Sequence, residues 1–542
     1  DPPPDRLHGS VQVDVMDASA AVQGRVADKW SAAVAARNSH LQWILDHVSK
    51  QDFDEFFQIP HYYDGQARIR RDLGEHEFIE TIGLLSFDEV ARNVASNDPR
   101  GRKTEKKHQS FGRVGIRYKN VSNAGATTEI LPWYGQDHSS LEATFGDVPT
   151  STAFDTHLFG LRARYAGKVT DTIVGTVGLD LEGSSTKAHR SGSTSSPPRE
   201  GDAHVFGQPP SDQINGDAWD AFIGSAAPFA ELDIGLFGDA LHVVPGLRFD
   251  PLFTSVSRRL PRDGDKPGVG ASQTDFAVEP RLSARYRLSR RATFKAAYGS
   301  YRQPPLAEDL SPVFGNPLLG AASGHHFLGG GEFQLTETLG VETTAFYTNS
   351  SHLAARNPIP SPLVAEALVD IGAGRSYGAQ FLVRKSLKDG FFGWIAYTLL
   401  RAERQDQPGT AYRLFDFDQT HVLTALAAYQ FGKGFDVSAR FRYASGYPRT
   451  PVVGSYYDTR RDLYEPELGP KNSTRIPDFW QLDVRLAKRF TFGTNEIEAY
   501  VDVQNVTNRE NPEEIAYSLD YTQKRYVYGL PILPVVGARW SF

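Results

Sequence analysis

The dominant pattern in this chain is a strict alternation of apolar and polar side chains. In FDVSARFRY, residues 435–443, an apolar set opposes a polar set that includes Asp436, Arg440 and Arg442. A period of two is that of a β-strand whose two faces meet different surroundings. Because a packed core does not accept unpaired charges, the polar face must lie in water or against charged partners.

The alternation recurs along the whole sequence and predicts 22 strands. They are expected at residues 10–16, 18–25, 29–40, 65–75, 79–91, 108–119, 125–136, 152–166, 169–184, 217–235, 239–257, 274–288, 291–301, 323–335, 337–349, 375–385, 390–401, 417–431, 434–445, 477–490, 494–508 and 535–542. Several are longer than the five or six residues usual in soluble sheets. They suit tilted membrane strands of roughly 9–11 residues that continue beyond the lipid.

The connections between these strands alternate between short and long. Tight turns are expected near residues 26–28, 76–78, 120–124, 167–168, 236–238, 289–290, 336, 386–389, 432–433 and 491–493. Long connections are expected at 41–64, 92–107, 137–151, 185–216, 258–273, 302–322, 350–374, 402–416, 446–476 and 509–534. Short turns on one rim and long loops on the other are typical of outer-membrane barrels. The sequence therefore predicts an all-β fold, a 22-stranded antiparallel transmembrane β-barrel with short periplasmic turns and long extracellular loops.

The sequence makes specific predictions for three further segments. The closing stretch VVGARWSF places Val536, Trp540 and Phe542 on one face, and we expect it to close the barrel with its aromatics toward lipid. Residues 185–200 are rich in Ser, Pro and Gly and are expected to form a mobile loop. Residues 42–57 form either a short helix over the mouth or a loop with buried aromatic side chains.

Composition narrows the class of protein further. Mean hydropathy is −0.40 and no apolar run approaches 18 residues, which is too polar for helical membrane spans. The absence of cysteine excludes disulfides, thiolate metal sites and a cysteine nucleophile. The net charge of −7 with mixed signs and no basic run argues against nucleic-acid binding. The first residues, DPPPDRLHGS, do not form a signal peptide, so an exported protein would be represented here by a mature or truncated chain.

Local motifs then point to a family. The stretch SYRQPPLAEDL followed by GNPLLG matches a recurring mid-barrel segment through residues Arg302, Pro305, Glu308, Leu310, Asn316, Pro317 and Leu319. DVQNVTNRENP at 502–512, SGYPRTP at 445–451 and the aromatic ending WSF match three further patterns. In this order and spacing the chain resembles the barrel domain of a TonB-dependent outer-membrane receptor. The motifs cover the last half of the chain, and the first half rests on its strand pattern.

The resemblance implies partners that this sequence does not itself supply. Family members carry an N-terminal plug domain inside the barrel, preceded by a short box that contacts the energy-transducing protein TonB. Here residues 1–9 are a lead-in where a plug would connect, and residues 10–542 form the barrel. Neither plug nor box is recognisable in the sequence. A 22-stranded barrel is too wide to be filled by its own side chains, so the plug is a separate or cleaved chain, is omitted, or the barrel is open.

No arrangement of side chains in the sequence indicates catalysis. There is no phosphate loop, no Gly-x-Ser-x-Gly elbow and no His-Glu-x-x-His, so we predict no enzyme activity, no catalytic residues, no cofactor and no metal site. His325 and His326 point to opposite faces of a strand and are not expected to chelate one ion. A divalent cation at the group Asp416, Asp418 and His421 is less expected than a solvated rim. Glu308 and Asp309 are expected to cap backbone groups rather than to catalyse.

Extracellular loops are the expected place for substrate capture. The candidates are aromatic residues beside polar groups: Tyr62, Tyr63, Arg302, Gln303, Phe314, Asn316, Tyr456, Tyr457, Arg460 and Arg461. For the aromatic members, a place in the membrane girdle is an equal expectation. The resemblance implies TonB-dependent uptake of a scarce nutrient across the bacterial outer membrane, of siderophore, vitamin, sugar or peptide class. The alternative is a passive channel or a structural barrel in an envelope complex.

Overall fold

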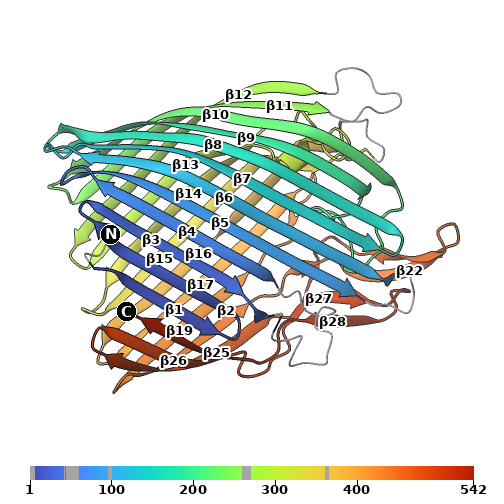
Figure 1. Ribbon diagram of the computed structural model, residues 1–542. Coiled ribbons are helices and arrows are strands. Elements are labelled where there is room, and N and C mark those ends of the chain that lie inside the picture. Colours follow the sequence, from blue (N-terminus) through green and yellow to red (C-terminus); the bar gives the residue numbers. More distant parts are fainter. Residues whose placement is uncertain (1–5, 42, 44–59, 95–100, 259–269, 360–364) are drawn as a thin grey trace.

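The chain forms one closed antiparallel β-barrel. The computed structural model describes residues 6–41, 43, 60–94, 101–258, 270–359 and 365–542. Its wall has 22 strands in chain order, and the first pairs with the last, with Ser10 opposite Ser541. Figure 1 shows both termini on the rim of short turns, and the long connections gather at the opposite end. The predicted strand number, order and closure are confirmed.

The wall strands are longest in the first half of the chain. They are β1 (His8–Asp14), β2 (Asp17–Ala27), β3 (Trp30–Ser39), β4 (His61–Asp72), β5 (Glu77–Val94), β6 (Lys103–Val121), β7 (Thr127–Phe145), β8 (Val148–Thr170), β9 (Ile173–Ser193), β10 (Ile214–Leu236) and β11 (Leu241–Arg258). The second half contributes β12 (Ala271–Ser289), β13 (Ala292–Gln303), β14 (Ala322–Gln334), β15 (Leu339–Arg356), β16 (Leu368–Lys388), β17 (Phe391–Gln405), β19 (His421–Gly432), β20 (Phe435–Ala444), β25 (Phe479–Phe492), β26 (Asn495–Gln504) and β29 (Leu533–Ser541).

The connection predicted at 137–151 is strand apart from a tight turn, and the one predicted at 185–216 is a loop only over 194–213, so the predicted bounds of both were wrong. Strands β7 and β8 continue through residues 137–151 and meet at a turn of only two residues, Gly146 and Asp147. Residues 185–193, expected to be mobile, belong to β9 and pair with both neighbours. Both stretches lie at the loop end of the wall, where lipid no longer imposes alternation and where Thr150 and Ala188 are buried on the inward face, so hydrogen-bonded pairing continues without apolar–polar alternation.

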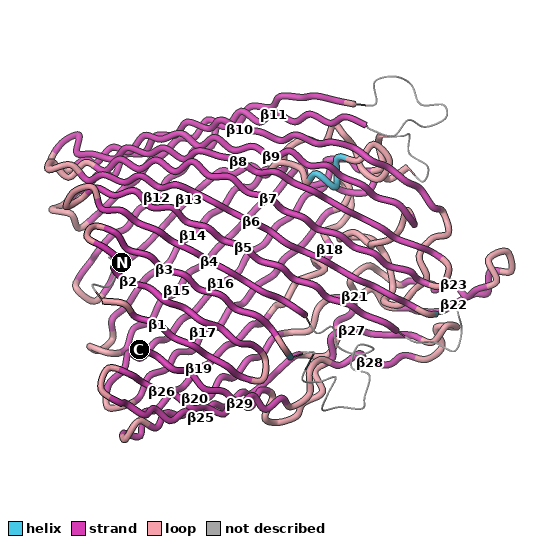
Figure 2. The backbone as a smooth tube through the Cα atoms, in the orientation of Figure 1, coloured by secondary structure: helices cyan, strands magenta, loops and turns pink. Residues whose placement is uncertain are grey.

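The long connections also contain small elements that the alternation did not reveal. They are the 3-10 helix η3 (Ala307–Leu310) and the short strands β18 (Arg413–Leu414), β21 (Pro448–Arg449), β22 (Val452–Asp458), β23 (Leu463–Leu468), β24 (Thr474–Arg475), β27 (Pro512–Tyr517) and β28 (Lys524–Tyr528). Figure 2 shows the helix inside the outline of the barrel near the loop end. Residues 42–57, for which a helix and a loop were both left open, fall almost wholly outside the described residues. No helix among the described residues has the length and apolarity needed to cross a bilayer.

The outward face carries aromatic side chains in two bands. Near the loop end, Tyr298, Phe327, Tyr347 and Tyr377 follow one another on neighbouring strands with ring centroids 5.0, 6.3 and 6.4 Å apart. Near the short turns the exposed aromatics include Trp30, Phe391, Phe431, Phe435, Phe490, Phe492 and Trp540. Aromatic girdles at both edges of an apolar band are typical of membrane barrels, as expected for Trp540.

The inward face carries charges, and these form ion pairs along the wall. Arg440 is 2.7 Å from Asp483, Arg485 is 2.6 Å from Glu498, and the guanidinium of Arg489 donates to Asp436 at 2.5 Å. Pairing of this kind explains how a charged face is accommodated in the strand pattern of the sequence. The lumen is therefore lined by fixed, mutually compensated charges.

Candidate ligand-binding site at the loop-bearing mouth

The segment between β13 and β14 folds back against the inner wall and narrows the mouth. Its Leu310 and Leu319 are almost fully buried against Trp219 of β10 and Leu368 of β16. The indole N–H of Trp219 donates to the carbonyl of Ala307 at 3.0 Å, and Ser311 Oγ donates to the Asp217 carboxylate at 2.9 Å. Burying these leucines and satisfying the buried polar atoms anchors the segment to the wall.

The motif residues of this segment explain its local shape. Ser311 Oγ accepts hydrogen bonds from the backbone N–H groups of Val313 and Phe314 at 3.1 and 3.0 Å, which closes a turn. Asn316 accepts from the Leu318 N–H at 2.8 Å and donates to the Leu368 carbonyl at 3.0 Å. The sequence GNPLLG thus ties the segment to itself and to β16.

A second loop, residues 194–213 between β9 and β10, is fixed to this segment by ion pairs. Arg199 donates from both guanidinium nitrogens to the Asp309 carboxylate. Arg356, at the end of β15, holds Asp202 in a two-point contact at 2.9 and 2.8 Å. Burial alone would raise the pKa of Asp202, but its hydrogen bond to Arg356 and the charge of that guanidinium hold the pKa below its usual range.

Arg413 of β18 links its own connection to the 194–213 loop, and we call this cluster of Arg413, Asp406, Asp416, Glu200 and Lys471 the Arg413 hub. The guanidinium contacts Asp406 at 2.8 Å, Asp416 at 2.9 Å and Glu200 at 3.1 Å. Lys471 adds a contact to Asp406 at 3.0 Å. Despite burial, hydrogen bonds from Arg413 and Lys471 lower the pKa of Asp406. Burial opposes the charged guanidinium, but the surrounding carboxylates raise the pKa of Arg413.

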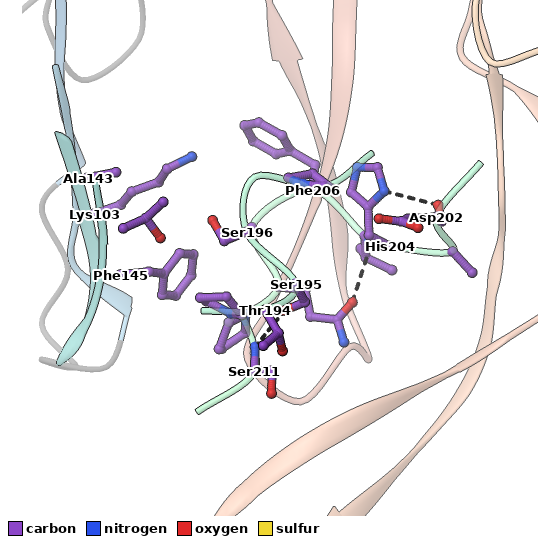
Figure 3. Close-up of a pocket in the computed structure, with 18 of the residues that line it drawn as sticks. Lys103, Ala143, Phe145, Thr194, Ser195, Ser196, Asp202, His204, Phe206 and Ser211 are labelled. Carbon is purple, nitrogen blue, oxygen red and sulfur yellow. Dashed lines mark hydrogen bonds between the residues drawn. The ribbon is translucent and has the colours of Figure 1, made fainter. Parts of the chain in front are cut away.

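Between the wall and the 194–213 loop lies a cavity of about 550 Å³, which we call the mouth chamber. Figure 3 shows Lys103 and Phe145 on the strand side and Asp202, His204 and Phe206 on the loop side. The chamber is also lined by Arg356 and by Arg461, from the tip of the β22–β23 hairpin.

Cationic side chains outnumber acidic ones in the lining of the chamber. Lys103, Arg356 and Arg461 face one acidic side chain, Asp202. Each cation also has a carboxylate partner: Arg356 pairs with Asp202, Arg461 with Glu465 and Lys103 with Glu105. Hydrogen bonds within the loop, from the Val205 N–H to Gln208 and from the Ser211 N–H to Ser195, fix its shape at 3.3 and 2.8 Å. Phe145 and Phe206 add flat apolar surface beside the cations.

A second cavity of about 350 Å³ lies against the inner wall below the 304–321 segment. Arg302 lines it, donating to Asp275 through its side chain and to Glu279 through its backbone N–H at 2.8 Å. Arg248 and Arg281 also line it, together with the acidic side chains of Glu182, Asp250 and Glu279. The second cavity is thus lined by charges of both signs.

The ten candidate residues from the sequence fall in different places. Arg461 lines the mouth chamber and Arg302 lines the second cavity, whereas Phe314 and Asn316 belong to the packed 304–321 segment. Tyr62 faces inward and donates to Asp17 at 2.7 Å; Tyr63 faces outward and stacks on Phe87 at 4.6 Å. Gln303 ends β13, and Tyr456, Tyr457, Arg460 and Arg461 lie on or at the tip of the β22–β23 hairpin.

The sequence did not single out several residues that line the chamber. Lys103, Phe145, His204, Phe206 and Arg356 come from four separate connections, and nothing in their local sequence shows that they meet. The one available signal is DAHVFGQPP at 202–210, which places an acid, a histidine and a phenylalanine in a Pro-rich loop. Aromatic and titratable residues in such a loop are candidates for contact with a ligand.

The groups considered for metal binding are engaged elsewhere. His325 stacks on Tyr298 and His326 lies against Tyr301, on opposite faces of β14. Asp416 is held by Arg413 and Asn472, and Asp418 by Arg475 and the Ala402 N–H. Across the described ranges, no three His, Cys, Asp or Glu side chains are grouped so that they could hold a metal ion.

The comparisons with known proteins agree with this architecture. A family described as "TonB dependent receptor-like, beta-barrel" matches residues 46–506. Among solved structures, the ferric-catecholate import receptor Fiu of E. coli K12 superposes with a TM-score of 0.69 at 12% identity, covering 99% of this chain and 82% of that one. The ferric citrate transporter FecA gives 0.71 at 15% identity, covering 99% and 79%. The copper transporter OprC gives 0.69 at 12%, covering 100% and 81%. No curated protein sequence matches.

Proposed function

Since the chain belongs to the TonB-dependent receptor family, whose members are transporters and not enzymes, we propose that it takes up a scarce, negatively charged nutrient. The observation that carries this proposal is the mouth chamber, with three cationic side chains, one acidic side chain and two aromatic rings around about 550 Å³. A volume of this size suits one small ligand.

The chemistry of the chamber supports an anionic chelate or acid over a neutral sugar. Arg356 and Arg461 each bind one carboxylate of the protein, Asp202 and Glu465. Their remaining guanidinium N–H groups can donate to a carboxylate or similar oxygen anion of a ligand. Phe145 and Phe206 would pack on the flat part of such a ligand. The named solved structures include an import receptor for ferric catecholates and a transporter for ferric citrate. Among the classes left open by the sequence, the siderophore class fits these features best.

The proposal includes a route and partners. A ligand captured in the chamber passes into the lumen, whose second cavity is lined by Arg248, Arg281 and Arg302. The barrel fold is characteristic of the bacterial outer membrane, and we place the protein there, with residues 10–542 as the barrel and residues 1–9 leading to a plug. Movement of that plug by a TonB-type protein would supply the energy for release inside.

Direct ligand binding tests the proposal. Protein purified from its native outer membrane is titrated with a panel of ferric chelates, carboxylates and neutral sugars, following intrinsic tryptophan fluorescence. Arg461→Gln and Phe206→Ala should each weaken binding of the anionic ligand about tenfold or more, because each removes a wall of the chamber. Arg460→Gln is the matched control, since Arg460 lies beside Arg461 outside the chamber lining. Equal loss in all three variants, or binding of sugars alone, would reject the proposed ligand class.

The alternative of a passive channel or structural barrel is separated by two measurements. Intact mass of the native material shows whether a plug accompanies the barrel, as a continuous or a separate chain. Conductance in planar bilayers then shows whether the lumen is open. A plug with low conductance supports gated uptake, whereas a barrel without plug and with steady conductance would support the channel.

A further inference from the structure

An unusual charged cluster lies on the outward face of the barrel wall. Arg375 of β16 and Arg401 of β17 both bind the carboxylate of Glu403, and we call this set the outer arginine pair. Arg375 Nε is 2.6 Å from one oxygen of Glu403, and Arg401 Nε is 2.7 Å from the other. These residues share the face of Tyr377 and Phe381, which belongs to the outward surface.

The geometry leaves both guanidinium groups ready to bind a second anion. Each arginine reaches Glu403 through Nε, and in the described part of the chain no protein acceptor is bonded to the terminal nitrogens of either. Glu403 is only 5% exposed, whereas the side chains of Arg375 and Arg401 are 38% and 53% exposed. The guanidinium of Arg375 also lies 4.3 Å from the ring centroid of Tyr412, which restricts its movement. The cluster thus consists of one buried carboxylate bound to two exposed guanidinium groups. Its net charge is one positive unit.

The cluster lies at the height of a lipid headgroup. Phe391, in the aromatic band near the short turns, is ten residues before Arg401 on β17. At about 3.3 Å per residue and a tilt of about 40°, this separation spans roughly 25 Å along the barrel axis. That is about the height of the apolar band of a membrane barrel, so Arg401 meets its upper edge. Tyr377, directly opposite Arg401, marks the same edge.

We propose that the outer arginine pair binds the phosphate of an outer-leaflet lipid headgroup. The paired N–H donors of a guanidinium group match the spacing of two phosphate oxygens. Two guanidinium groups held a fixed distance apart can therefore bind one phosphate from both sides. The acyl chains of the same lipid would lie below, along the exposed Tyr377 and Phe381. A free anion would find no such apolar surface, and for that reason we assign the site to a lipid. This site is independent of the ligand proposed for the mouth chamber.

Native mass spectrometry of the purified barrel tests the proposal. The probe is diphosphorylated lipid A, added to the protein in detergent, with chemically dephosphorylated lipid A and inorganic phosphate as separate arms. Wild type should retain the diphosphorylated lipid at least about tenfold better than the triple variant Arg375→Gln, Arg401→Gln, Glu403→Gln. The triple variant replaces the buried carboxylate together with both arginines. It therefore leaves no unpaired buried charge that would destabilise the fold. The double variant Arg375→Lys, Arg401→Lys keeps both positive charges but lacks the paired N–H donors. It should retain an intermediate amount of the diphosphorylated lipid.

Arg489→Gln is the matched control because it breaks a guanidinium–carboxylate contact with Asp436 on the inward face. It should retain the lipid as wild type does. Equal retention by wild type and the triple variant would overturn the proposal, as would equal retention of the dephosphorylated lipid. If inorganic phosphate at millimolar concentration displaced the lipid completely, the assignment to a lipid would fail as well.

Discussion

Gly446 has no space for a side chain. A Cβ atom placed there would lie 1.8 Å from the carbonyl oxygen of Ile476, where the SGYPRTP stretch passes close to the short link between β24 and β25. Its neighbour Ser445 is buried and accepts the backbone N–H of His421 at 3.1 Å. The small residue and the short hydroxyl therefore allow two connections to meet at the top of β19 and β20.

Replacing Gly446 by Ala should destabilise the barrel, because a backbone carbonyl must move to make space. We expect a loss of about 2–3 kcal/mol in the free energy of unfolding, measured by urea titration in lipid vesicles. Gly329→Ala is the control, since a Cβ at Gly329 meets no atom within 4 Å, and it should change stability by less than about 1 kcal/mol. Equal effects of the two substitutions would show that the close approach of Gly446 to the Ile476 carbonyl does not determine the stability of the barrel.

Two carboxylates of the mouth loops should make the loop contacts sensitive to acid. The pKa of Asp406 is lowered by Arg413 and Lys471 against the effect of burial, and that of Asp202 by Arg356. A lowered pKa means that the contacts contribute stability above the unfolded value of 3.8 and lose it as pH falls below that value. Hydrogen exchange of residues 199–202 and 406–416, corrected for intrinsic rates, should be slow at pH 7 and accelerate below about pH 4. Unchanged protection down to pH 3 would contradict this.

At the scale of elements, the sequence predicts strands only where lipid lies on one side. All 22 wall strands were predicted, because lipid and water impose alternation on every membrane-spanning segment. The alternation fails for the upper parts of β7, β8 and β9, which pair in register although lipid no longer lies on one side, and whose inward face is partly buried, as at Thr150 and Ala188. It also misses the 304–321 segment, whose buried Leu310 and Leu319 are isolated in a Pro-rich stretch. Their burial depends on Trp219, far away in the sequence.

Removing the Arg413 hub should release the loops that it joins while the wall stays intact. Arg413→Gln leaves Asp406, Asp416 and Glu200 without their shared cation, so residues 199–208 and 406–416 should exchange amide hydrogen at least about tenfold faster. Exchange in β8 and β9 should not change, because their ladders do not involve Arg413. In this variant, the acceleration of hydrogen exchange in residues 406–416 at low pH should also become smaller, because Arg413 no longer lowers the pKa of Asp406.

Arg460→Gln is the control for this experiment. Arg460 is exposed at the tip of the β22–β23 hairpin, and its backbone N–H donates to Asp458 at 2.9 Å. Among the described residues its side chain has no ion-pair partner. Loops that remain protected in Arg413→Gln would show that the packed 304–321 segment alone holds the mouth together.

At the scale of the whole molecule, the sequence predicts the closed wall but not the arrangement of its mouth. Closure follows from strand number and turn lengths, which are local properties. The mouth chamber and the Arg413 hub join residues more than 200 positions apart, such as Glu200 and Arg413, and either residue alone looks like surface charge. Of the ten candidate ligand residues, Arg302 and Arg461 line cavities, because position on a loop does not determine the direction of a side chain.

The seam between β1 and β29 is the contact on which closure depends. Tyr500 of β26 reaches across Gly537 of β29 and donates to Asp14 of β1 at 2.6 Å. At the short-turn rim, Phe542 exchanges two backbone hydrogen bonds of 3.0 Å with Gly9, and its ring covers that glycine. A Cβ at Gly9 would lie 2.3 Å from the ring, so the two residues must be coupled energetically.

A double-mutant cycle measures this coupling. Phe542→Ala should lower the free energy of unfolding by about 1–3 kcal/mol, because the half-buried ring no longer covers the seam. Gly9→Ala should cost a similar amount in the wild-type barrel, since the ring must move aside. In the Phe542→Ala background the same Gly9→Ala change should cost less than about 0.5 kcal/mol, because the space is then free. Additive effects would show that the ring already moves freely, and the closure of the barrel would then rest on the β1–β29 ladder and the Tyr500–Asp14 hydrogen bond.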